Sequence, residues 1–272
     1  MLPERLVPRH GIVVTVVALA LHAALVILAS ETPPSAKTIH AFVSLADNDH
    51  QGIVPVPARL GNGEDPANNL YWGARFGVRS WFRKASSWVE VTVSRPSSAT
   101  ILESVAFRHK KTGAILVADA YRGAAIREAI TAFLSAAGDG PAETVSIRDG
   151  THTSEIEVSG HASLVAYVGH DGLMDFELKD LPTTRKPRAR PVIVLACASK
   201  SFFAPALRAA GAEPLLWTTG LLAPEAYILE AALDGWLAGE SGDAIRLRAA
   251  AAYDEHQKCG RKAAERLFAT GW

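Results

Sequence analysis

Cysteine is scarce in this sequence, which has only Cys197 and Cys259 among its 272 residues. Two cysteines are too few for a scaffold held together by several disulfides. A single disulfide between them remains an open alternative to two free thiols. Neither cysteine lies near the N-terminus, so a lipid-modified N-terminal cysteine is excluded.

The sequence also lacks an excess of charge of either sign, because 28 basic residues balance 28 acidic ones and the pI is about 7.1. A protein without a basic surplus has no broad electrostatic attraction for polyanions, so we do not expect nucleic acid as a partner. Hydrophobic residues make up 49% of the chain. That share is enough for the sizeable core of one globular domain.

Two common site patterns are missing as well. No serine lies in a Gly-x-Ser-x-Gly elbow, which disfavours a hydrolase that uses another nucleophile, such as Ser199. No close His-x-x-x-His pair or carboxylate cluster defines a metal site. The residues that a metal site would have to draw on are His50, His152, His161, Asp47 and Asp49. We therefore predict neither a metal nor a cofactor.

The N-terminus contains the clearest local signal. Arg5 and Arg9 precede an apolar run from Gly11 to Ala29, which Glu31 and two prolines end. This order is typical of an export signal, and we predict one over residues 1–30. The run is just long enough to span a bilayer, so an uncleaved anchor is the competing interpretation and the only expected membrane contact. Either way the protein is expected to be exported, to the periplasm or to the outer face of the inner membrane.

The remainder, residues 37–272, has the pattern of one α/β domain. Near-continuous apolar runs at 162–168 and 192–196 predict strands that are buried on both faces, as in a parallel sheet covered by helices. A similar first strand is predicted at 39–46, and periodic apolar residues predict a helix over 122–137. The further predicted elements are a hairpin of 104–109 with 114–120, a strand at 214–218, and helices at 201–210, 224–238 and 243–268, the last broken near Gly260.

Chemically reactive side chains follow three of these predicted strands, at 47–50, 169–172 and 197–199. Loops at the carboxyl ends of strands in an open α/β sheet are where functional groups gather. Adjacent parallel strands lie about 4.8 Å apart, so side chains at equivalent strand ends come within reach of one another. His170 and Cys197 are thus the candidates for a proton acceptor and a thiol.

These two segments resemble the caspase-like cysteine peptidases, and among them the bacterial CHAT-type domains. The resemblance rests on an apolar strand that delivers Gly169 and His170, and on a second strand that ends in Ala196 and Cys197. The downstream pattern of a helix, Ala-Gly-Ala and another strand over 203–217 also resembles that family. The resemblance implies a three-layer sandwich with a mostly parallel central sheet and helices on both faces. One departure is that Asp171, with Gly172 one place later, stands where the family usually has a glycine directly after the histidine.

The resemblance further implies an enzyme in which His170 is the general base and acid, while Cys197 attacks a peptide carbonyl to form a thioester. Backbone N–H groups of Cys197 and of Gly169 or Asp171 are then expected to stabilise the oxyanion, and Gly169, Asp171 and Gly172 are the candidate oxyanion or orienting residues. The partner implied is a protein or peptide substrate.

Family pockets often bind a charged substrate residue, and the candidate acids for a basic one are Asp47, Asp49 and Asp175. Asp171 is either a surface turn residue or an orienting partner of His170. The alternative function is a non-catalytic caspase-like module that serves binding or assembly in the cell envelope.

Overall fold

The structure is a computed structural model that describes Met1, residues 36–181, Thr184 and residues 188–272. One compact unit extends from Ala36 to Trp272. The predicted export signal or anchor over residues 1–30 lies outside the described residues, apart from Met1. Within the part that is described, no helix is both long and apolar enough to cross a bilayer.

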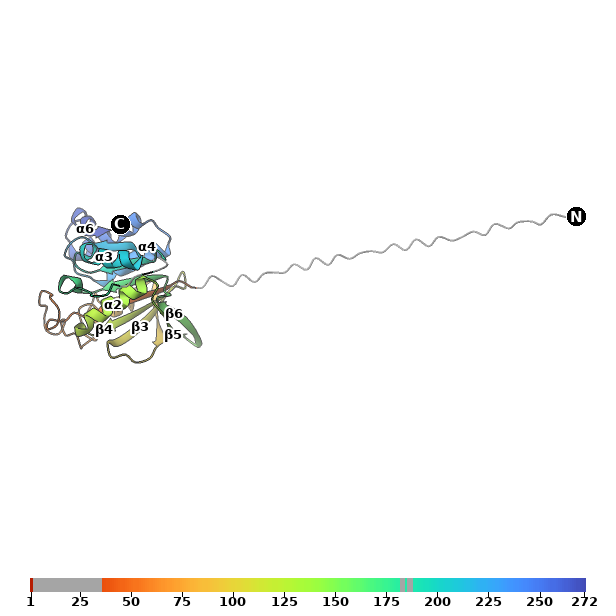
Figure 1. The fold of residues 1–272 in the computed structure, drawn as a ribbon, viewed down its shortest axis with the longest axis horizontal. Helices are drawn as coiled ribbons and strands as arrows, with labels where there is room; N and C mark the ends of the chain where they lie inside the picture. Colours follow the sequence, from red (N-terminus) through yellow and green to blue (C-terminus); the bar gives the residue numbers. More distant parts are fainter. Residues whose placement is uncertain (2–35, 182–183, 185–187) are drawn as a thin grey trace. The chain divides into compact units, whose positions relative to one another are not determined.

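The described chain forms a sheet of ten strands together with helices that connect them (Figure 1). The strands are β1 Thr38–Ser44, β2 Trp88–Ser94, β3 Ile101–His109, β4 Ile115–Tyr121, β5 Ala142–Asp149, β6 His152–Ser159, β7 Leu164–Val168, β8 Pro191–Leu195, β9 Glu213–Thr218 and β10 Phe268–Ala269. The α-helices are α1 Val78–Phe82, α2 Ile126–Ala137, α3 Ser199–Ala210, α4 Ala226–Leu237, α5 Gly242–Gln257 and α6 Arg261–Leu267. Two one-turn helices, η1 Gly123–Ala125 and η2 Gly172–Met174, lie in the connections.

The order of the strands is β10-β9-β8-β7-β1-β4-β3-β2-β5-β6. The middle strands β4, β1, β7, β8 and β9 run parallel to one another. The flanking strands β3, β2, β5 and β6 on one side, and β10 on the other, pair antiparallel. The prediction of an α/β fold is confirmed, but the sheet is mixed rather than mostly parallel.

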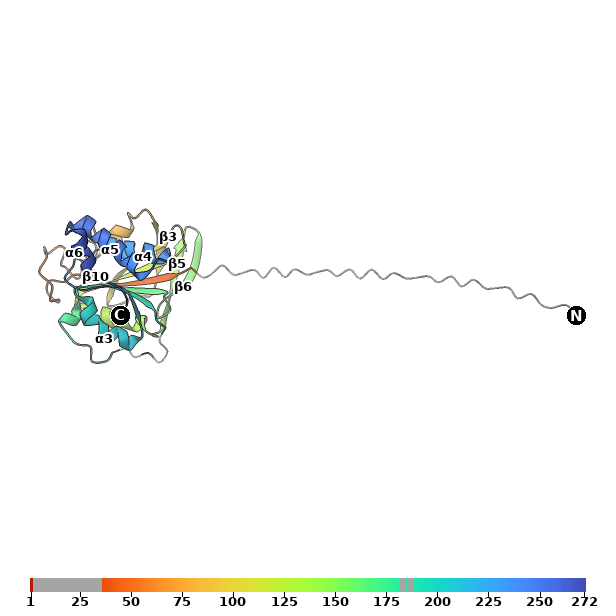
Figure 2. The same ribbon diagram turned by 90° about the horizontal axis from the view of Figure 1, so that it is seen from above.

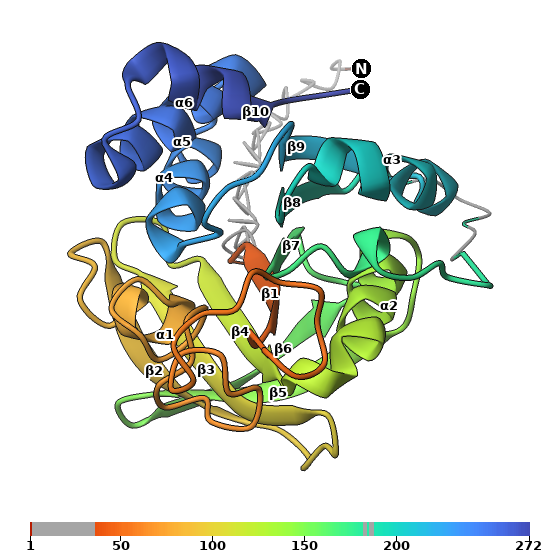
Figure 3. The ribbon, with the colours of Figure 1, turned by 90° about the vertical axis from the view of Figure 1, so that its left-hand side faces the viewer.

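Helices cover both faces of this sheet, as Figures 2 and 3 show. On one face α2 and α3 pack through Phe133 and Phe203 into one hydrophobic cluster. On the other face α1, α4, α5 and α6 contribute to a second and larger cluster. The parallel strands are buried between these two clusters, one on each face of the sheet. Their side chains are therefore apolar on both faces, which gives continuous apolar runs in the sequence.

The first strand illustrates this arrangement. Ile39, Ala41 and Val43 of β1 face the larger cluster, whereas Phe42 faces the cluster of α2 and α3. Successive side chains of a strand point to opposite faces, so both sets must be apolar when both faces are buried. Figure 3 shows β1 in the centre of the sheet, between β4 and β7.

His40 interrupts the apolar pattern of β1 because it belongs to a buried polar network. Its Nε2 lies 2.7 Å from Oδ2 of Asp119 in β4, and its Nδ1 accepts the N–H of Ser159 at 3.2 Å. Arg95 donates to the same carboxylate, and the Ser104 hydroxyl donates to its other oxygen at 2.6 Å. Burial alone would raise the pKa of Asp119, but His40, Arg95 and Ser104 outweigh it and lower that pKa to about 2.

We expect Asp119→Asn to lower the free energy of unfolding by about 2 kcal/mol near neutral pH. The folded-state pKa lies below the ordinary value, so this stabilisation is present above about pH 4 and is lost as the pH falls toward about 2. Urea denaturation of both proteins at a series of pH values measures it. Asp139→Asn, at an exposed position, is the matched control and should change little. An unchanged stability in Asp119→Asn would show that the network is not stabilising.

Candidate functional site

His170 and Cys197 lie at matched positions beyond two neighbouring parallel strands. Val168 at the end of β7 pairs with Leu195 at the end of β8, and each functional residue follows two positions later. The ladder continues one step further, since the N–H of Gly169 donates to the Leu195 carbonyl at 3.1 Å. The predicted juxtaposition of the two loops is therefore present in the fold.

Local backbone geometry directs the chain at both strand ends. Gly169 has φ +150°, and a Cβ there would lie 2.9 Å from the Ser44 carbonyl oxygen of β1, so only glycine fits. Ala198, directly after Cys197, has a left-handed conformation with φ 47° and forms the N-cap of α3. A non-glycine residue in that region is strained by about 1–2 kcal/mol, and such strain is found where a sharp strand-to-helix turn presents a side chain.

Both residues line one pocket with a volume of about 450 Å³. Its walls come from the loop that follows β1, from the η2 segment and from the loop that follows β9. His170 is 8% exposed and Cys197 is half-buried. Both cysteines are free thiols, so the alternative of a disulfide between Cys197 and Cys259 is not what the structure contains. The sulfur of Cys197 is thus open to chemistry from this pocket.

The imidazole of His170 is held by Asp175. Nε2 of the ring lies 2.6 Å from Oδ2 of Asp175, which also accepts the N–H of Gly52 at 3.0 Å. A carboxylate oxygen that accepts this hydrogen bond requires the proton on Nε2, and in the neutral ring that tautomer leaves the lone pair on Nδ1 free. Among the described residues, no group is hydrogen-bonded to Nδ1. Asp175 was predicted to bind substrate, and the structure instead makes it the residue that orients His170.

The backbone of His170 is fixed as firmly as its ring. Its carbonyl oxygen accepts the Tyr167 hydroxyl at 2.8 Å and the N–H of Gly172 at 3.1 Å. Gly172 is buried, and a Cβ there would lie 2.8 Å from the ring of Phe176. These contacts fix the loop at Gly172, whose predicted oxyanion or orienting role stays a prediction.

The thiol of Cys197 points to a different acceptor in this structure. Its Sγ lies 3.6 Å from the Leu222 carbonyl oxygen, and no hydrogen bond joins it to His170 within the described part of the chain. Hydrogen bonds between catalytic groups are often long or unformed until a substrate is bound. Rotation of the thiol away from Leu222 is therefore one step that the proposed chemistry requires.

The predicted oxyanion donors need a correction. The N–H of Gly169 is used by the Leu195 carbonyl, so it is not available to an oxyanion. The N–H groups of Cys197 and Asp171 have no hydrogen-bond partner in the described part of the chain. Cys197 lines the pocket, whereas Asp171 is fully buried and does not line it, so the N–H of Cys197 is the predicted donor that remains.

Asp171 is neither a surface turn residue nor the partner of the His170 ring. The side chain is fully buried at the start of η2, where Oδ1 accepts the N–H of Leu173 at 3.1 Å. Its Oδ2 has no partner among the described residues. Burial raises the pKa of Asp171 to about 7, with a smaller contribution from the charge of Asp175.

We expect Asp171→Asn to stabilise the protein at alkaline pH. Because the folded-state pKa is raised, the wild type loses stability as the pH rises from about 4 through about 7, by up to about 4 kcal/mol. Asparagine can still accept the Leu173 N–H and has no charge to bury. Thermal unfolding between about pH 5 and 9 should show a falling curve for the wild type and a flatter one for Asp171→Asn. Parallel curves would contradict this assignment.

Asp47 and Asp49 do not line the pocket that contains Cys197, and their role in binding substrate stays a prediction. Asp47 is buried, and its Oδ1 accepts the N–H groups of Asp49 and His50 at 2.9 and 3.2 Å. Both acids line a separate hollow with Asn48 and Gly63. The carboxylate of Asp47 closes its own turn, while Gly52 and Ile53 of the same loop reach the pocket that contains Cys197.

The two alternative sites, a serine nucleophile at Ser199 and a metal site, are not supported by the structure. Ser199 is fully buried, and its hydroxyl donates to the Val194 carbonyl and accepts the N–H of Thr218, each at 3.0 Å. It joins β8, β9 and α3 and does not face a pocket. In the described residues there is no group of three or more His, Cys, Asp or Glu side chains that could hold a metal ion.

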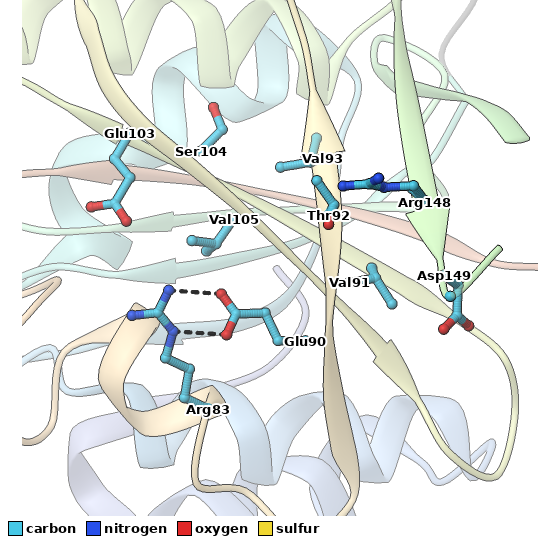
Figure 4. Close-up of a pocket in the computed structure, with 11 residues that line it drawn as sticks. Arg83, Glu90, Val91, Thr92, Val93, Glu103, Ser104, Val105, Arg148 and Asp149 are labelled. Atoms are coloured by element: carbon cyan, nitrogen blue, oxygen red, sulfur yellow. Dashed lines mark hydrogen bonds and ion pairs between the residues drawn. The ribbon is translucent and has the colours of Figure 1, made fainter. Parts of the chain in front are cut away.

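A further hollow lies over β2, β3 and β5, and its lining differs from that of the pocket that contains Cys197 (Figure 4). Arg83 donates two hydrogen bonds to Glu90, at 2.8 and 2.7 Å. Glu103 is engaged by Arg79 and by the Trp72 indole. Its acids are occupied by neighbouring bases, and no cysteine or histidine lines it in the described part of the chain.

Sequence reasoning missed the loop that follows β9, from Gly220 to Glu225. It brings Leu221, Leu222 and Glu225 to the pocket. The available signal was that β9 is a further apolar strand beside β8, so that its carboxyl end adjoins Cys197.

Comparisons of the chain with protein-family models, with curated proteins and with solved structures found no match.

Proposed function

We propose that the protein is a cysteine hydrolase that cleaves peptide bonds through Cys197 and His170. The observation that carries this proposal is that the two side chains line one pocket from matched positions after β7 and β8. A thiol and an imidazole in one open pocket, with the imidazole oriented by a carboxylate, form the arrangement that nucleophilic catalysis needs.

In this proposal Nδ1 of His170 takes the proton from Sγ of Cys197, and the resulting thiolate attacks the substrate carbonyl carbon. The imidazolium then gives its proton to the leaving amine as the C–N bond breaks, which leaves a thioester on the sulfur. Water, deprotonated by the same imidazole, hydrolyses the thioester and restores the thiol. Asp175 keeps the ring in the required tautomer and stabilises its positive charge throughout.

The oxyanion that forms at each tetrahedral step needs nearby N–H donors. The backbone N–H of Cys197 is the donor that we assign to it, because it has no hydrogen-bond partner in the described part of the chain and Cys197 lines the pocket.

We further propose that the domain is a member of the caspase-like fold, in which a parallel sheet covered by helices presents a histidine and a cysteine after adjacent strands. The parallel region β4-β1-β7-β8-β9, with helices on both faces, supports this assignment. We also propose that residues 1–30 direct the protein out of the cytoplasm. Fractionation of cells that produce the full chain tests that proposal.

Labelling of Cys197 tests the proposed dyad. In a Cys259→Ser background, a peptidyl chloromethyl ketone should alkylate Cys197, as followed by mass spectrometry of the intact protein. His170→Ala should slow this reaction by roughly a hundredfold, because the thiol loses its proton acceptor. His161→Ala is the matched control, since that exposed histidine pairs with Glu157 outside the pocket.

Alkylation at the same rate with and without His170 would leave only an accessible thiol and overturn the dyad. Absence of any alkylation would instead favour a non-catalytic module that binds a partner through this pocket.

A further inference from the structure

The pocket beside Cys197 has an apolar floor that is anchored in the core. Ile53, Leu70 and Leu222 line the pocket and at the same time pack against the hydrophobic cluster of α4, α5 and β1. Side chains supported in this way do not need to be ordered when a ligand arrives. A preformed floor of this kind favours the binding of an apolar group.

The rim of the same pocket is apolar and exposed to solvent. Val54, Met174 and Leu221 are 86%, 44% and 74% exposed, and all three line the pocket. They come from three separate loops, yet they gather at one opening. Exposed large apolar side chains that cluster at the mouth of a pocket are a feature of binding sites.

The carboxylates in and beside the pocket are already hydrogen-bonded to other groups of the protein. Glu225 is the one carboxylate that lines the pocket among the described residues. Its Oε2 already accepts the Tyr227 hydroxyl at 2.6 Å and the Gln257 amide at 2.9 Å. Asp175, the nearest further acid of the site, is hydrogen-bonded to His170 and Gly52.

We propose that this pocket binds a large apolar side chain of a peptide substrate, of the size of leucine or phenylalanine, next to the carbonyl that Cys197 attacks. The inference rests on the proposed function for the position of that carbonyl. The binding itself needs no turnover, so it can be measured when the thiol is absent. The substrate class is then a peptide with an apolar residue before the cleaved bond, and not the basic residue that the family resemblance implied.

The test uses the inactive full chain Cys197→Ala and three fluorescent, blocked tripeptide amides that differ only in a terminal leucine, lysine or aspartate. Fluorescence anisotropy should show the leucine peptide bound about tenfold or more tightly than the other two, as expected for burial of one large apolar side chain. Adding Leu221→Asp should remove that preference, and the exposure of Leu221 makes this change tolerable to the fold. Phe202→Asp is the control, because Phe202 is also an exposed apolar residue but does not line the pocket.

Equal binding of the three peptides, tighter binding of the lysine peptide, or no binding at all would each overturn the apolar assignment. A leucine preference that persists in Leu221→Asp would also overturn it. If the leucine preference is present while His170→Ala leaves the rate of Cys197 alkylation unchanged, the proposed catalysis is contradicted and the proposed apolar binding is retained. The two proposals are therefore separable.

Discussion

Replacing Cys197 with alanine is expected to lower kcat/KM for peptide hydrolysis by about a thousandfold or more. The reason is that alanine removes the only thiol among the described residues that line the pocket, and with it the atom that forms the thioester. Steady-state hydrolysis of a fluorogenic peptide measures the loss. The fold should be unaffected, since the half-buried thiol makes one long hydrogen bond to the Leu222 carbonyl.

The matched control is Cys259→Ala, which removes the other free thiol. Cys259 is exposed between α5 and α6 and does not line the pocket. Its replacement should leave kcat/KM unchanged. Equal losses in both variants, or retained hydrolysis in Cys197→Ala, would rule out Cys197 as the nucleophile.

Replacing Asp175 with asparagine is expected to lower kcat by roughly a hundredfold with little change in KM. An asparagine amide can donate to Nε2, which would move the ring proton to Nδ1 and remove the lone pair that must accept the thiol proton. The carboxylate is also lost as a partner for the imidazolium that forms during the reaction. Kinetic measurement of kcat and KM separately checks this expectation.

Asp175→Glu should restore part of kcat, because it keeps a carboxylate within reach of the ring. Asp180→Asn, which changes an exposed acid a few residues further along the same connection, is the control and should have no effect. A fall in thermal stability without the split between kcat and KM would mean that Asp175 is only a structural residue. A rise in KM alone would instead return Asp175 to the substrate-binding role that the sequence suggested.

Much of the parallel half of the fold could be predicted because its strands carry a strong signal. Burial on both faces makes β1, β7 and β8 continuous apolar runs, and helix periodicity was clear for α2. In the antiparallel half, only the hairpin of β3 and β4 was predicted as a pair of strands. The sequence of an alternating strand such as β5 does not indicate which strand it pairs with. The pairing of β5 with β2, which extends the sheet, was therefore not predicted.

The sequence predicted those residues of the site that directly follow a buried strand. His170 and Cys197 follow buried neighbouring strands, and their approach follows from the sheet. Asp175 was assigned to substrate because its contact with His170 depends on η2, a single turn without a clear sequence signal. The direction of the Asp47 carboxylate could not be predicted for a similar reason, since hydrogen bonds within one turn decide where it points.

The central place of β1 also has a consequence for how the chain reaches its native state. Ile39 of β1 lies opposite Leu116 of β4 on one side and Leu164 of β7 on the other. Strand β1 is therefore synthesised well before the two strands that it pairs with. The hairpins β3–β4 and β5–β6 need only short loops to close and should form early. Until β7 arrives, Thr38–Ser44 is an apolar segment with unpaired edges, and this interval is when the nascent chain is most exposed to aggregation.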